Sequence, residues 1–177
     1  MAIPQILLLI LNVFGGAAVI GSYAQGIISH PGNLNILWGN ISTSVRPIYF
    51  VSMLLSALGY FAFIYFILFR LDPAAVRVAG KIGFEVFFVI FTGMLLFSSL
   101  WMPFTYSYVD NPNSGTWLAI RIVLFLVAIS SCALLWALLS LNTKTPTIPY
   151  WLAVVGSGYF AFHTLVLDGF LWPALYK

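Results

Sequence analysis

Two ionisable residues, His163 and Asp168, lie inside an apolar run near the end of the chain. The run covers residues 149–172 and has the sequence PYWLAVVGSGYFAFHTLVLDGFLW. It is long enough to cross a bilayer, which takes about 20 mostly apolar residues. An ionisable group in such a segment is costly unless it faces a bundle interior, a wet cavity or the interface. We therefore expect this segment to do more than anchor the chain.

Proton transfer is one chemistry that these residues could perform, and with Glu85 they suggest a small proton-coupled transporter as one hypothesis. Enzyme chemistry is not indicated, because no nucleophile and base occur at a recognisable spacing. On an α-helix, at about 100° per residue, His163 and Asp168 point to different faces. Glu85 follows Lys81 by one turn, a spacing at which the two can form an ion pair.

Metal chemistry is not indicated either. The chain has two histidines, and no pair within the spans is available to hold a haem iron axially. We therefore predict no metal site, and we expect His163 to form hydrogen bonds between helices.

The composition indicates an integral membrane protein. Hydrophobic residues make up 62% of the 177 residues and charged residues 6%, whereas soluble domains carry roughly 25% charged residues. This length leaves no room for a separate soluble domain. The basic residues occur singly rather than in a run, so nucleic acid is excluded as a partner.

Five apolar segments predict an all-α bundle of five transmembrane helices that forms a single domain over residues 1–177. The expected spans are residues 3–28, 47–69, 82–101, 117–141 and 149–172. The longest polar connection, residues 29–46, is expected to cover one end of the bundle, because unusually long loops are often functional. In the first span, Ala17 and Gly21 have the spacing that permits close helix contact.

The basic residues suggest an orientation. Because cytoplasmic loops carry an excess of Lys and Arg, the end that holds the N-terminus is predicted to be cytoplasmic in a bacterial membrane. That end carries Arg70, Arg77, Lys81 and Lys144, and the opposite end carries Arg46, Arg121 and Lys177.

Aromatic and polar residues gather at the opposite end, which we call the loop end because the long first connection lies there. Such a group predicts a small-molecule pocket with flat aromatic walls and a few polar anchors. A belt of interfacial aromatic residues without a pocket is the alternative. The residues concerned are Trp38, Trp101, Trp117, Trp172, Arg46, Arg121 and Asp168, with His163 about two turns deeper.

Several short motifs resemble those of the translocator protein family, also called the tryptophan-rich sensory proteins. The stretch at residues 56–60, SALGY, is similar to the family's S-A-M-G-Y. Residues 101–103, WMP, are similar to its W-x-P, residues 149–150 to its P-Y, and residues 21–23, GSY, to the end of its first helix. The chain departs from the family at residues 40–43, NIST, where W-x-P-P is expected, and at Ala161, where asparagine is expected.

The resemblance implies a non-enzymatic, homodimer-forming binding protein for porphyrins, haem or sterol-like lipids, with its pocket under the first loop. It implies no required cofactor, since porphyrin or haem would be the ligand. Trp101 and Pro103 carry over from the motif. Arginine is expected to meet ligand carboxylates, because the guanidinium forms paired hydrogen bonds with them. The predicted ligand-binding residues are Trp38, Arg46, Trp101, Pro103, Phe104, Trp117, Arg121, His163 and Asp168.

An accessory subunit of a larger membrane complex is the alternative function. The small-residue helix faces and exposed aromatic side chains would then contact partner subunits within the lipid.

Overall fold

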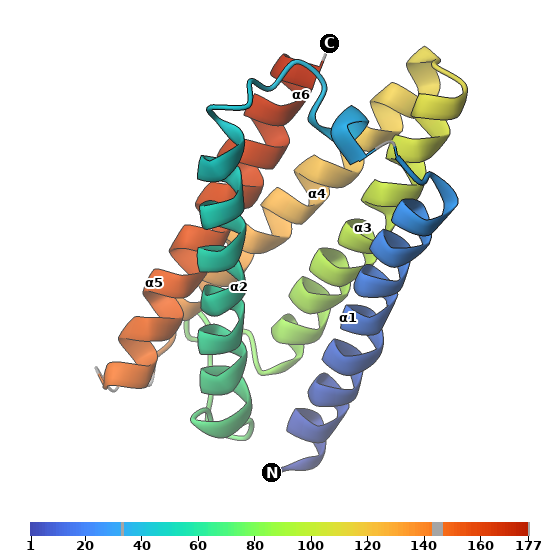
Figure 1. Cartoon of the computed structure of the whole chain (residues 1–177). Helices are drawn as coiled ribbons and strands as arrows, with labels where there is room; N and C mark the ends of the chain where they lie inside the picture. Colours follow the sequence, from blue (N-terminus) through green and yellow to red (C-terminus); the bar gives the residue numbers. More distant parts are fainter. Residues whose placement is uncertain (33, 143–146, 177) are drawn as a thin grey trace.

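The computed structural model describes residues 1–32, 34–142 and 147–176, so Lys144 and Lys177 lie outside the described part. Five helical segments in it are long and apolar enough to cross a membrane. This confirms the predicted all-α bundle of five transmembrane helices (Figure 1). The first four are α1 (Ile3–Ser29), α2 (Arg46–Phe69), α3 (Glu85–Asp110) and α4 (Ser114–Leu139). The fifth consists of α5 (Ile148–Phe162), the π-helical segment η2 (His163–Leu171) and α6 (Trp172–Tyr176).

The helices pack in an order that differs from their order along the chain. Helix α1 packs along α3, α3 along α4, and α5 lies against both α4 and α2. The two termini lie at opposite ends of the bundle (Figure 1). The first connection contains a short 3₁₀ helix, η1 (Leu34–Trp38).

The half of the bundle near the N-terminus holds the larger apolar core. Leu8, Phe63, Phe87 and Phe91 are fully buried there. Polar contacts join α1 to its neighbours: the Gln5 side-chain amide donates to the Leu71 carbonyl at 3.0 Å, and the Tyr60 hydroxyl donates to Asn12.

Glycine allows a close backbone-to-backbone contact between α2 and α5. A β-carbon built on Gly59 of α2 would lie 2.6 Å from the carbonyl oxygen of Gly156 in α5, well inside van der Waals contact. By contrast, Ala17 and Gly21 are exposed on α1. Within this chain the pair makes no helix contact, and α1 packs on α3 through Gly15 and Gly26.

The third helix extends further along the chain than the span predicted for it. Helix α3 continues to Asp110, because Met102, Thr105 and Tyr106 extend its buried face by two turns. Pro103 consequently lies inside a helix rather than in a loop. Turn formers from Asn111 onward end the helix.

The predicted ion pair between Lys81 and Glu85 is wrong. Glu85 begins α3, and its carboxylate accepts a hydrogen bond from the Gly83 backbone N–H at 2.9 Å. Lys81 precedes the helix, so the one-turn spacing does not apply.

Candidate functional site

Four tryptophans from four parts of the chain meet at the loop end, as the sequence predicts. Trp101 of α3 contacts Trp172 of α6 edge to face, with ring centroids 5.7 Å apart, and Trp117 of α4 lies 6.1 Å from Trp172. Trp38 packs on the same apolar cluster. We call Trp38, Trp101, Trp117 and Trp172 the tryptophan cluster.

The first connection is fastened over this end by hydrogen bonds to α6. The Trp172 indole N–H donates to the Leu37 carbonyl at 2.9 Å, and the Asn40 N–H donates to the Leu175 carbonyl at 3.1 Å. Gly39 has φ +50°, and a β-carbon there would lie 2.4 Å from the Tyr176 carbonyl oxygen. Glycine is the residue that tolerates both constraints. The expected cover over the loop end is therefore present (Figure 1).

Neither predicted arginine reaches the interior of the bundle. Arg46 donates to the Asn35 side chain at 2.8 Å and to the Ile41 carbonyl at 3.2 Å, and its guanidinium lies 5.6 Å from the Trp38 ring centre. It thus fixes the first connection to the start of α2. Arg121 is exposed and lines a shallow surface hollow of about 290 Å³ beside Leu118.

The two other predicted ligand-binding residues on α3, Pro103 and Phe104, differ in burial. Phe104 is partly buried and packs on the same apolar cluster as the tryptophans. Pro103 is exposed. Of the motif residues that the resemblance carries over, Trp101 therefore belongs to the cluster and Pro103 faces away from the interior.

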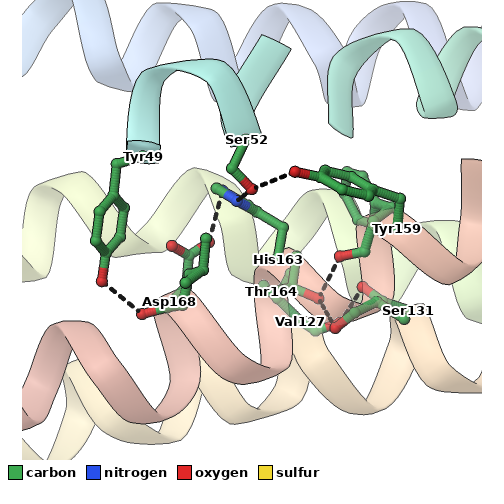
Figure 2. Close-up of polar contacts among 11 residues, drawn as sticks. Tyr49, Ser52, Val127, Ser131, Tyr159, His163, Thr164 and Asp168 are labelled. Carbon is green, nitrogen blue, oxygen red and sulfur yellow. Dashed lines mark hydrogen bonds and ion pairs between the residues drawn. The ribbon is translucent and has the colours of Figure 1, made fainter. Parts of the chain in front are cut away.

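A series of polar side chains runs through the interior between α2 and the fifth helical segment (Figure 2). The Tyr159 hydroxyl donates to Ser52 Oγ at 3.1 Å, and Ser52 Oγ lies 2.8 Å from His163 Nδ1. At the other side of the ring, His163 Nε2 lies 3.5 Å from Asp168 Oδ2. Ser52 and His163 are buried. The expectation that His163 bonds between helices is confirmed, since Ser52 belongs to α2.

The direction of these hydrogen bonds identifies the histidine tautomer. Because Tyr159 donates to Ser52, the single hydroxyl hydrogen of Ser52 is free to point to Nδ1, which then accepts. We infer from this arrangement that the ring hydrogen is on Nε2, which lies 3.5 Å from Asp168 Oδ2. In this tautomer the polar side chains are oriented towards the carboxyl group of Asp168.

The π-helical segment brings His163 and Asp168 together. The predicted separation on different faces is wrong because it assumed α geometry, whereas η2 forms wider turns with bonds between residues five apart. The Trp172 N–H accordingly donates to the Leu167 carbonyl, an oxygen that also accepts the Tyr49 hydroxyl at 3.2 Å. Pro173 follows, and its ring would clash with the carbonyl four residues earlier in a regular α-helix.

Asp168 is the accessible end of the polar chain. Its side chain is 34% exposed, against 9% for His163. The hydroxyls of Tyr23 and Tyr49 are within electrostatic range of the Asp168 carboxyl group. Tyr23 also contacts Trp101, with ring centroids 5.6 Å apart. Among the described residues, His163 is the basic side chain within ion-pair distance of Asp168, and it would carry a charge only when protonated; no Lys or Arg reaches Asp168.

Ser52, His163 and Asp168 together have the composition of a hydrolase triad, but the geometry differs in two ways. Ser52 is 2% exposed, so its oxygen cannot reach a substrate. The carboxylate, which in a triad is buried behind the histidine, is here the accessible group. The arrangement presents an acceptor rather than a nucleophile.

Ser52, Tyr159, Tyr23 and Tyr49 were missed in the sequence. A signal existed for two of them: the buried positions of α2 include Tyr49, Ser52, Ser56 and Gly59, which recur at helical spacing and place hydroxyls on the same face as the close glycine contact. Tyr23 and Tyr159 have no such signal, because they become neighbours of Asp168 and Ser52 only in the folded bundle.

Comparison of the chain with protein-family models, with curated proteins and with solved structures finds no match.

Proposed function

We propose that the protein is a non-catalytic membrane receptor for a flat hydrophobic small molecule, such as a porphyrin, haem or a sterol-like lipid, bound at the loop end. The observation that carries this proposal is the tryptophan cluster under a fastened loop, with the partly exposed Asp168 four residues before Trp172 in the same helical segment. Flat apolar walls with a few polar anchors are what small-molecule sites generally provide. The resemblance to the translocator proteins points to the same ligands.

Trp101 is the residue on which the proposal depends most directly. It is partly exposed, contacts both Tyr23 and Trp172, and its buried Nε1 has no hydrogen-bond partner among the described residues. An unsatisfied buried N–H is costly, so an acceptor on a ligand that displaced the neighbouring rings would gain a favourable contact.

The test is a titration of the purified protein with protoporphyrin, followed by quenching of tryptophan fluorescence. We expect saturable quenching that Trp101→Ala weakens by about tenfold or more, since stacking on one aromatic ring contributes of the order of 1–3 kcal/mol. Trp136→Ala is the matched control, because Trp136 is 47% exposed on α4 and outside the tryptophan cluster.

Two results would contradict the proposal. One is unchanged affinity in a folded Trp101→Ala variant, and the other is quenching of the wild type that never saturates. In either case the tryptophans would be an interfacial belt, and the accessory-subunit hypothesis would be examined next.

A further inference from the structure

The charge at the candidate site has the opposite sign to the one that the sequence suggests. Arg46 and Arg121 were expected to meet ligand carboxylates, but both lie outside the interior. The accessible ionisable group there is acidic: Asp168, with 34% of its side chain exposed. A ligand carboxylate brought to this place would meet a like charge, which is unfavourable in a medium of low polarity.

The polar side chains next to Asp168 do not supply a positive charge to balance its carboxylate. The Tyr159 hydroxyl donates to Ser52, Ser52 Oγ lies 2.8 Å from His163 Nδ1, and His163 Nε2 lies 3.5 Å from Asp168 Oδ2. None of these groups is positively charged when His163 carries its single hydrogen on Nε2. Ionised groups inside membrane proteins are typically paired. A cation is the partner that an ionised Asp168 would require.

The surroundings of Asp168 favour an organic cation. The Tyr49 hydroxyl donates to the carbonyl of Leu167, the residue before Asp168. Tyr23 is within electrostatic range of the carboxylate, and Trp101 lies against Tyr23. The faces of aromatic rings attract ammonium groups, whereas a small metal ion requires several oxygen ligands. A protonated amine on a hydrophobic body would use the carboxylate and the rings together.

We propose that Asp168, together with Tyr23 and Trp101, binds the protonated amine of a flat hydrophobic ligand. This inference rests on the proposed function, because the ligand's body would occupy the tryptophan cluster. It adds the chemical class of the head group: a primary or substituted ammonium, in preference to a hydroxyl or a carboxylate.

The test compares three pyrenes that share one ring system and differ in the head group: pyrenylmethylamine, pyrenylmethanol and pyrenecarboxylate. Energy transfer from tryptophan to pyrene reports binding to the protein in phosphatidylcholine nanodiscs, and empty nanodiscs correct for partition into lipid. We expect the amine to bind about tenfold more tightly than the alcohol, and the carboxylate to bind most weakly. Replacing sodium by lithium or caesium in the buffer distinguishes an alkali-ion site, where the apparent affinity for the amine would change with the size of the competing ion.

Two aspartates at the loop end allow a matched comparison. Asp168→Asn should abolish the preference for the amine and leave alcohol binding unchanged. Asp110→Asn should keep the preference, because Asp110 is 63% exposed and pairs with His30 on the surface.

The outcomes separate the two proposals. Saturable binding of all three pyrenes with equal affinity, or an amine preference that persists in Asp168→Asn, would overturn the amine site and leave the hydrophobic receptor standing. No saturable binding of any pyrene would overturn both. If Asp168→Asn does not fold, the order of the three affinities in the wild type still shows whether the site prefers an amine.

Discussion

At the scale of single residues, the candidate site depends on the direction of a few hydrogen bonds. Ser52 accepts from Tyr159 and lies 2.8 Å from His163 Nδ1. We infer that Ser52 donates to Nδ1 and so selects the tautomer with its hydrogen on Nε2, on the side of Asp168. Loss of this serine would leave a buried ring nitrogen without a donor, which is the costly outcome of removing one hydrogen-bond partner.

We predict that ¹⁵N NMR of the His163 ring shows a hydrogen on Nε2 and none on Nδ1, and that Ser52→Ala mixes the two tautomers. The variant should also lose about 1 kcal/mol of stability, the usual size for interhelical hydrogen bonds in membranes. Ser99→Ala is the control, because Ser99 donates to a carbonyl of its own helix. A hydrogen on Nδ1 in the wild type would mean that His163 donates to Ser52, which is the reverse of the assigned hydrogen-bond direction.

The sequence predicts which types of residue matter at this scale better than it predicts their partners. His163 and Asp168 stand out because ionisable residues are rare in apolar segments, and the gathering of the tryptophans follows from where the spans end. The partners depend on rotation about each helix axis. A single-sequence pattern does not define that rotation when nearly every face is apolar, and so Arg46 and Arg121 were expected to line the pocket.

At the scale of elements, two local departures from regular packing build the site. The π-helical segment η2 puts residues five apart on one face. The sequence gives no sign of this, because the same hydrophobic residues fit both an α-helical and a π-helical pattern. The glycine contact between α2 and α5 sets how closely Ser52 approaches His163. The five spans were predictable from length and hydropathy, whereas these contacts depend on tertiary structure.

Gly59→Ala should separate α2 from α5 and lower stability by about 1–3 kcal/mol, the usual cost of overpacking. The added methyl group would meet the Gly156 backbone, which cannot move aside as a flexible side chain can. Gly16→Ala is the matched control: nothing lies within 4 Å of a β-carbon at Gly16, so its stability should be unchanged or slightly raised. Thermal unfolding in one detergent measures both, and equal midpoints for the two variants would contradict the close contact.

At the scale of the whole molecule, the two ends of the bundle differ in character. One end is closed by a compact connection in which the Val78 backbone pairs with Ile82 and Leu141, and it carries Arg70, Arg77 and Lys81. The other end holds the fastened first connection and the tryptophan cluster. A ligand that reaches Asp168 would therefore approach from the loop end or from the surrounding lipid.

Labelling of single cysteines tests this arrangement across the membrane. In a Cys132→Ala background expressed in bacteria, Ser44→Cys lies in the first connection and Ala75→Cys in the second, and both positions are exposed. Since basic residues favour the cytoplasmic side, a maleimide that cannot cross membranes should label Ser44→Cys in intact cells and Ala75→Cys only after permeabilisation. Because α2 is the one span between the two positions, labelling of both in intact cells would contradict a spanning α2. The reverse pattern would keep the five spans and place the loop end, with its candidate amine site, in the cytoplasm.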